Sequence, residues 1–280
     1  MRIYAPAKLN LCLYLGPRRE DGLHELCSLF EPLALADPIE VSEAERDEVV
    51  CPGVEGENLA ARALAALRER GWEGPPLRVE IEKRIPVAAG LGGGSADAAA
   101  VLRLATGQVD DLPAIAAGLG ADVPSQLNPS LALVQGAGER IESLPEPTPH
   151  AAVLLPCGGG LSTADVFAEA DRLELGRDAA ELDYLAARLR AAAGAGASPL
   201  DYADLLHNDL EPAARSLRPD IGDALDALRA AGAPIALLTG SGPTSVGLFS
   251  TESGAKRSAE RLGRDDAIVC EAGAMAVFLS

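Results

Sequence analysis

The segment GLGGGSADAAA at residues 90–100 has the strongest chemical signature in this sequence. Its glycines stand directly before an Ala-rich stretch that predicts a helix from about Ser95 to Ala105, with Ser95 as the N-cap. A glycine loop that runs into a helix directs several backbone N–H groups at one point, which favours phosphate binding. The segment has neither the Lys-Ser/Thr of a Walker A loop nor the spacing of a dinucleotide fingerprint. A glycine turn with no ligand is the alternative interpretation.

Asp122 in GADVPS and Lys8 in KLNLCLYL gain meaning only in combination with other residues. The functional interpretation of Asp122 is a general base. Asp122 is equally consistent with a residue that hydrogen-bonds within its own turn, and Lys8 with a solvated surface lysine. His24 is one of three histidines, and no histidine cluster in the sequence suggests a metal site.

Alternating side chains predict a half-buried strand over residues 8–15, with Lys8 and Asn10 on the face opposite the leucines. Further strands are expected at 28–35, 39–43, 77–82, 151–156, 235–238 and 245–249, and helices at 57–70, 95–105, 164–173, 178–193 and 220–231. Because these elements do not alternate regularly as βαβ units, they predict an α+β fold. The Pro-rich segment PEPTPH at 145–150 predicts a boundary between a domain at 1–150 and a domain at 151–280.

Composition limits the classes of function. The 280 residues carry a formal net charge of −18, which opposes binding to nucleic acid because the phosphate backbone is itself negative. The five cysteines are scattered singly, which is typical of reduced cysteines in a cytoplasmic protein. We find no signal peptide and no apolar run long enough to span a membrane, so we expect a cytoplasmic protein without a membrane partner.

Taken together, several motifs resemble the GHMP kinase superfamily, over nearly the whole chain. They are APAKLNLCLYL at 5–15, DGLHELCSLFEPL at 21–33, IPVAAGLGGGSADAAA at 85–100, LGADVPS at 119–125 and LTGSGPTS at 238–245. GLSTADVF at 160–167 and LHNDLE at 206–211 are similar to the members that phosphorylate the 2-hydroxyl of a cytidine-diphosphate-linked methylerythritol in non-mevalonate isoprenoid biosynthesis. The resemblance implies a two-domain architecture, with a ribosomal protein S5-like N-terminal domain, a ferredoxin-like C-terminal domain, and the active site in the cleft between them.

The resemblance also implies a role for individual residues. Lys8 and Asp122 match the catalytic pair, and Asn58 and Lys83 are expected to approach the adenosine of ATP, which carries Mg²⁺ with it. The ATP phosphate loop is matched by Pro86, Val87, Ala88, Ala89, Gly90, Leu91, Gly92, Gly93, Gly94, Ser95 and Ala96. The substrate pocket is matched by Asn10, His24, Thr163 and Phe167. The expected partner is a small-molecule substrate, and the chain is expected to be a monomer or a homodimer.

Three positions depart from the family pattern. Leu23 stands where an aromatic residue often stacks on cytosine, so stacking on the base is either weaker or provided by Phe167. The segment after Pro124 is SQLNPS, and Ala137 replaces a common arginine. Three alternatives remain: a GHMP kinase for homoserine, mevalonate or a related alcohol, a catalytically silent nucleotide sensor, and an S5-like RNA-binding module. The presence of both Lys8 and Asp122 counts against the sensor, and the net charge counts against the RNA-binding module.

Overall fold

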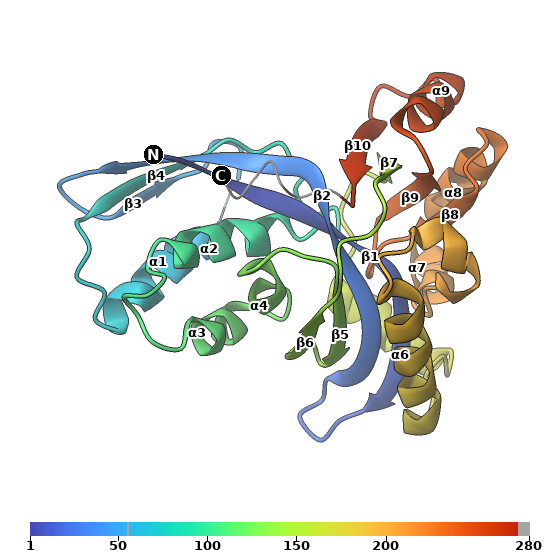
Figure 1. The fold of residues 1–280 in the computed structure, drawn as a ribbon, viewed down its shortest axis with the longest axis horizontal. Coiled ribbons are helices and arrows are strands. Elements are labelled where there is room, and N and C mark those ends of the chain that lie inside the picture. The colour runs from blue at the N-terminus through green and yellow to red at the C-terminus, as the bar shows by residue number, and fades with distance from the viewer. Residues whose placement is uncertain (55, 274–280) are drawn as a thin grey trace.

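Two long antiparallel strands run through the molecule in the computed structural model, which describes residues 1–54 and 56–273 (Figure 1). They are β1 (Arg2–Arg18) and β2 (His24–Glu43). In their register Lys8 lies opposite Pro32 and Asn10 opposite Phe30, and a register shift occurs on either side of this short stretch. Such bulges re-aim side chains, and here they flank the two polar residues of the strand.

The N-terminal strands form one part of the sheet. β2 also pairs antiparallel with β4 (Leu77–Ile81) and β5 (Ala132–Gly136). β3 (Glu48–Val50) runs parallel to β4, and β6 (Arg140–Ser143) antiparallel to β5. One face of these strands is covered by α1 (Leu59–Glu69), α2 (Gly93–Arg103), α3 (Leu112–Leu119) and α4 (Val123–Gln126), as Figure 1 shows. Alanines dominate the buried face of α2, which allows α1 and α2 to pack closely.

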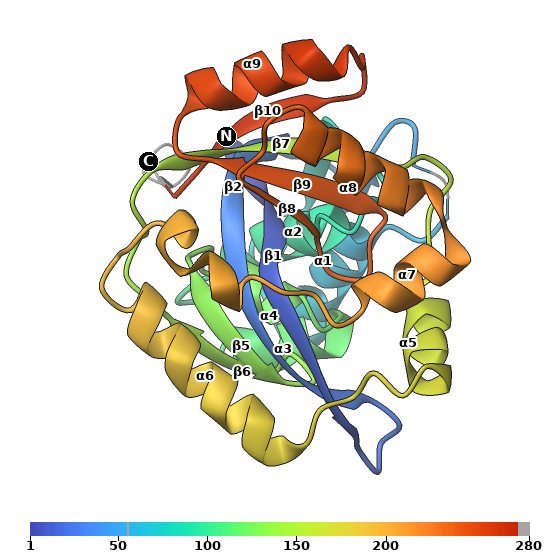
Figure 2. The ribbon, with the colours of Figure 1, turned by 90° about the vertical axis from the view of Figure 1, so that its right-hand side faces the viewer.

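The C-terminal strands are antiparallel and lie in the order β10, β7, β9, β8. They are β7 (His150–Pro156), β8 (Ile235–Leu238), β9 (Thr244–Phe249) and β10 (Ile268–Ala272). Figure 2 shows α8 (Asp220–Ala230) and α9 (Glu252–Leu262) against these strands. The remaining helices are α5 (Thr163–Arg172), α6 (Ala179–Ala193), the 3₁₀ helix η1 (Pro199–Leu205) and α7 (Glu211–Leu217). β10 joins the two sets of strands because Ala272 lies opposite Leu33 of β2.

Most of the predicted elements are confirmed, and the fold is α+β. The helices predicted at 57–70, 164–173, 178–193 and 220–231 lie within two residues of α1, α5, α6 and α8. The apolar runs at 28–35 and 39–43 belong to one strand, β2. The division into two domains at residue 150 stays a prediction, and residues 274–280 of the second domain lie outside the described part of the chain.

Two local predictions are wrong. The strand at 8–15 is not half-buried, because Lys8 and Asn10 are 6% and 2% exposed. Their face is covered by the glycine loop and by the loop between β8 and β9. Ser95 is not the N-cap either, because α2 begins at Gly93 and Gly92 is the cap. Gly92 has φ near 70°, a conformation that glycine adopts without strain, so the chain enters the helix early.

Candidate active site

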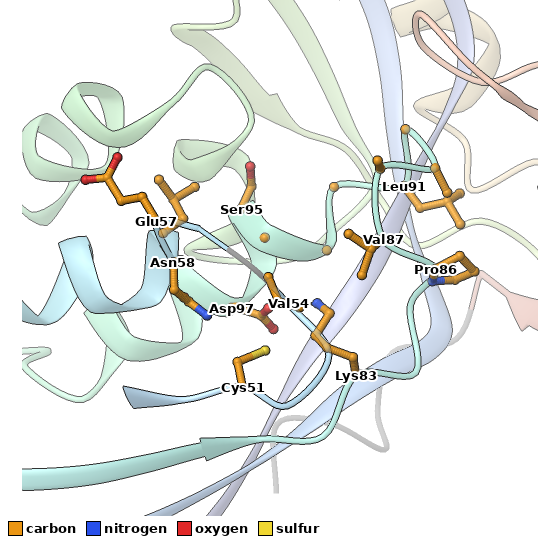
Figure 3. A pocket seen from close by; sticks show the side chains of 17 residues that line it. Cys51, Val54, Glu57, Asn58, Lys83, Pro86, Val87, Leu91, Ser95 and Asp97 are labelled. Atoms are coloured by element: carbon orange, nitrogen blue, oxygen red, sulfur yellow. Dashed lines mark hydrogen bonds and ion pairs between the residues drawn. The ribbon is translucent and has the colours of Figure 1, made fainter. Parts of the chain in front are cut away.

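Residues 86–95 line one side of a cavity of about 350 Å³ (Figure 3). No side chain caps the N-terminus of α2, so its first N–H groups are left for a ligand. Glycine is required at two positions of this loop. A Cβ on Gly92 would lie 2.9 Å from Cγ of Lys8, and a Cβ on Gly90 would lie 2.5 Å from the carbonyl oxygen of Gly242. Gly94 instead faces open space, with no atom within 4 Å of an added Cβ.

Asn58 and Asp97 supply polar atoms to the same cavity, where Figure 3 shows them close together with Cys51. Oδ1 of Asn58 accepts a hydrogen bond from the backbone N–H of Ala60 at 2.8 Å and caps α1, which leaves the amide N–H₂ as a donor. Oδ1 of Asp97 is buried without a partner among the described residues. The amide N–H₂ of Asn58 therefore suits the polar edge of a nucleoside, whereas Oδ1 of Asp97 is buried within the cavity wall.

Lys83 lies in the cavity wall between two carboxylates. Its Nζ is 2.8 Å from Oδ2 of Asp97 and also contacts Asp37, whose side chain is fully buried. Burial opposes the charged ammonium, but Asp97 and Asp37 outweigh this effect and raise the pKa of Lys83. Burial raises the pKa of Asp97 despite Lys83, and nearby Asp37 raises it further. Asp37 also accepts from the backbone N–H of Ile85 at 2.8 Å, so the cluster fixes the start of the glycine loop.

A second cavity, of about 780 Å³, meets the first at Gly90 and Gly92, which line both. It brings together the sequence-predicted catalytic and substrate residues, namely Lys8, Asn10, His24, Asp122, Thr163 and Phe167. Leu23 and Ala137, two of the departures from the family pattern, also line it. Of the predicted phosphate-loop residues, Ala96 is the exception, because its side chain is fully buried in the core and lies outside both cavities.

Lys8 and Asp122 form an ion pair in this second cavity, with Nζ and Oδ2 3.2 Å apart. Nζ of Lys8 also donates to Oδ1 of Asn10 at 2.8 Å and lies 4.8 Å from the centre of the Phe30 ring. The interpretation of Lys8 as a solvated lysine is wrong, since its side chain is 7% exposed. The turn interpretation of Asp122 is also wrong. Asp122 precedes α4, yet its carboxylate makes no capping bond.

His24 and Phe167 form the wall of the second cavity near α5. Their ring centres are 5.4 Å apart, and Nε2 of His24 is 2.8 Å from Oδ1 of Asp171. Because a carboxylate only accepts hydrogen bonds, this contact places a proton on Nε2, and in the neutral ring Nδ1 is then an acceptor. Thr163 bonds to Ser241, with their hydroxyl oxygens 2.9 Å apart.

Sequence reasoning missed Phe30, Asp171 and Ser241 as residues of the site. A signal for Asp171 was available, because Thr163, Phe167 and Asp171 are spaced by four and share one face of a predicted helix. No such signal existed for Phe30, which depends on the strand register.

The oxygen atoms of the side chains around the glycine loop suit a metal ion only when phosphate oxygens supply most of its ligands. Within residues 1–54 and 56–273, no group of three or more His, Cys, Asp or Glu side chains could hold a metal ion. Ser95 lines the first cavity and Asp122 the second, so a hydroxyl and a carboxylate flank the glycine loop. Mg²⁺ commonly uses one or two such oxygens together with phosphate oxygens and water.

Comparisons with known proteins agree with this geometry. The family model for the GHMP kinases N terminal domain matches residues 58–124, and the model for the GHMP kinases C terminal matches residues 181–267. The 4-diphosphocytidyl-2-C-methyl-D-erythritol kinase of Mycolicibacterium gilvum is 41% identical over 90% of this chain and 83% of its own length. The kinase of the same name from Thermobifida fusca is 40% identical over 93% of this chain and 90% of its own.

Solved structures give the same result. A crystal structure of 4-(cytidine 5'-diphospho)-2C-methyl-D-erythritol kinase matches with a TM-score of 0.81 and 36% identity, covering 98% of this chain and all of that one. A homoserine kinase from Cytophaga hutchinsonii matches with a TM-score of 0.70 at 17% identity, covering 97% of this chain and 94% of that one, and shows a shared fold alone. The chain therefore belongs to the GHMP kinases and, within them, to the family of 4-diphosphocytidyl-2-C-methyl-D-erythritol kinases.

Proposed function

We propose that this chain transfers the γ-phosphoryl group of ATP to the 2-hydroxyl of 4-diphosphocytidyl-2-C-methyl-D-erythritol, a step of non-mevalonate isoprenoid biosynthesis. One observation carries the proposal: the ion pair of Lys8 and Asp122 stands in a large cavity that meets the glycine-loop cavity at Gly90 and Gly92. A phosphate donor in the first cavity and an alcohol in the second would meet at that edge.

The size of the second cavity favours this acceptor over homoserine or mevalonate. Its volume is about 780 Å³, more than twice that of the first cavity. Phe30 beside Lys8 and His24 six residues earlier on the same strand both line it. A cytidine diphosphate linked to a five-carbon polyol is much larger than homoserine or mevalonate. We place its base near His24 and Phe167 and its 2-hydroxyl near Asp122.

In the proposed mechanism, Asp122 accepts the proton of the 2-hydroxyl as that oxygen attacks the γ-phosphorus of ATP. The bond from the γ-phosphorus to the β,γ-bridging oxygen breaks, and ADP leaves with that oxygen. Lys8 is held by Asn10 and Asp122, so its ammonium stays fixed beside the attacking oxygen and stabilises the charge that develops there. The free N–H groups at the start of α2 bind the phosphate oxygens. Mg²⁺ carried with ATP would neutralise phosphate charge, and Ser95, which lines the first cavity, is the protein oxygen that would help to hold it.

Two features support a cytoplasmic location as part of the proposal. The five cysteines are free, as expected for a reducing compartment. The described residues contain no helix of the length and apolar character needed to cross a bilayer.

A substrate panel tests the proposed function. The purified chain is incubated with ATP, Mg²⁺ and one of three acceptors: 4-diphosphocytidyl-2-C-methyl-D-erythritol, homoserine or mevalonate. ADP release and the phosphorylated product are both measured. We expect the cytidine-linked acceptor to have by far the highest kcat/KM. Equal or faster turnover of homoserine or mevalonate would refute the proposal and favour a different GHMP kinase.

A further inference from the structure

The loop of residues 239–243, between β8 and β9, is held from behind by the side chain of Asn208. The amide nitrogen of Asn208 donates to the carbonyl oxygens of Leu238 and Gly240, both at 2.7 Å. Its Oδ1 accepts from the backbone N–H of Leu210 at 2.9 Å. Asn208 is 3% exposed and lines neither cavity. Its amide group is therefore used entirely to fix backbone.

The opposite side of this loop contacts both halves of the active site. Oγ1 of Thr239 accepts from the backbone N–H of Asn10 at 2.7 Å. Just beyond the loop, Oγ1 of Thr244 donates to the carbonyl oxygen of Ala89 at 2.6 Å. Both threonines are fully buried. The loop is thus wedged between the strand that carries Lys8 and the glycine loop.

The contact with the glycine loop leaves no spare room. A Cβ added to Gly90 would lie 2.5 Å from the carbonyl oxygen of Gly242. A Cβ added to Gly240 would lie 3.0 Å from Oδ1 of Asn10. A shift of the 239–243 loop would therefore push on Gly90 or on Asn10. Those residues hold the phosphate donor and the catalytic lysine.

We propose that Asn208 is a positioning residue for phosphoryl transfer. By fixing the 239–243 loop, it sets the distance between the glycine loop and the pair of Lys8 and Asp122. The inference rests on the proposed function, because it assumes that phosphate and alcohol meet between these groups. Misplacement of reacting groups by about 1 Å can cost about 10²-fold in rate, so a side chain outside the cavities can control turnover.

The first test is Asn208→Asp, which keeps the size of the side chain and the acceptor for Leu210 but removes both donated bonds. We expect kcat to fall at least about tenfold, with KM for the acceptor within about twofold, because transition-state alignment is lost while acceptor contacts remain. The Kd for ATP should rise about threefold or more, because the glycine loop is displaced. The matched control is Tyr14→Phe, which removes another buried hydrogen bond to a backbone carbonyl, the one from the Tyr14 hydroxyl to Leu205 at 2.7 Å. This control should lower the Tm without lowering kcat.

The second test stands even where Asn208→Asp fails to fold. Thr244→Val keeps the volume but loses the bond to Ala89, and it should lower kcat as Asn208→Asp does. Thr244→Ser keeps that bond while removing a buried methyl group, so it should lose stability and keep kcat. Equal kcat in the valine and serine variants, or a fall in Tyr14→Phe as large as in Asn208→Asp, would overturn the inference.

The outcome for the proposed function is separate. A wild-type chain that does not phosphorylate the cytidine-linked acceptor refutes that function. The titration of each variant with ATP then tests whether the 239–243 loop positions the glycine loop. A Kd for ATP in Asn208→Asp and Thr244→Val equal to that of the wild type would overturn the proposed role of Asn208.

Discussion

Asp122→Asn is the substitution that separates catalysis from structure most cleanly at this site. Asparagine is nearly isosteric with aspartate but cannot accept a proton from the substrate hydroxyl. Within the described residues, the Asp122 carboxylate contacts only Lys8, in the ion pair, and no capping bond is lost. The backbone carbonyl of Asp122, which accepts from Ser125, is unaffected.

The structure sets the expected sizes of the two effects. The side chain of Asp122 is 33% exposed and that of Lys8 is 7% exposed, so solvent screens the ion pair only in part. The asparagine oxygen can still accept a hydrogen bond from Lys8, so the substitution should cost about 1 kcal/mol of stability. Lys8 keeps its bond to Asn10. A general base typically contributes about 10²- to 10⁴-fold, so kcat should fall at least about 10²-fold, or about 2.7 kcal/mol in activation free energy.

Steady-state ADP release with the cytidine-linked acceptor gives kcat, titration gives the Kd for ATP, and thermal unfolding gives the Tm. We expect a large fall in kcat with ATP affinity and Tm close to wild type. Ser125→Ala is a suitable control because it alters only the turn that contains Asp122. Asn10→Asp is not suitable, because Asn10 contacts Lys8. A folded Asp122→Asn variant whose kcat is within a few-fold of wild type would refute proton transfer to Asp122 and leave positioning by Lys8 as the source of catalysis.

Three further predictions concern the nucleotide site, the base and the buried histidine. Gly94→Val should raise the Kd for ATP about tenfold or more while the Tm changes little, because the new side chain enters only the space left for phosphate; unchanged affinity in a titration would count against the loop. Asp171→Asn should lower the preference for the cytidine-linked over the uridine-linked acceptor about fivefold, which is equivalent to one hydrogen bond of about 1 kcal/mol. The reason is that His24 no longer has a fixed tautomer that accepts from the cytosine amino group. An equal ratio of kcat/KM values for the two acceptors in the variant and the wild type would contradict this. His150 is buried against Glu31, and although burial opposes its charge, Glu31 and a backbone carbonyl raise its pKa above 6.5. The charged His150 therefore stabilises the fold fully below pH 6.5, and this stabilisation is lost as the pH rises through the higher pKa of the folded state. Denaturant unfolding should show a smaller decline in stability over that pH range for His150→Gln than for the wild type. Parallel pH profiles of the two proteins would contradict this prediction.

The sequence predicted the residues of the site better than their surroundings. The period of two along a strand was enough to place Lys8 and Asn10 on one face, where they do contact each other. The same period could not predict that this face is buried, because the covering loops come from residues near 90 and 240. Pairings such as Lys83 with Asp37 likewise depend on tertiary contacts across 46 positions of sequence.

The error at Ser95 has a different origin. N-cap preference is a statement about side chains, and serine is among the preferred residues. In this chain the backbone freedom of Gly92 decides where the helix begins. The helix end that results has no side-chain cap, and we propose that its N–H groups bind phosphate.

The place of β10 in the sheet has a consequence for how the chain folds during synthesis. In the path of paired strands, β10 stands between β2, near the start of the chain, and β7, while being itself the last strand of the described residues. Domains generally fold N-terminal first as the ribosome extends them. The strands before residue 144 can pair as soon as they emerge, but the sheet connection through β10 must wait until residues 268–272 have been made. The growing chain therefore leaves β2 unpaired at Leu33, between its pairings with β5 and β4, until residues 268–272 emerge, so the link between the two sets of strands forms last among the described strands.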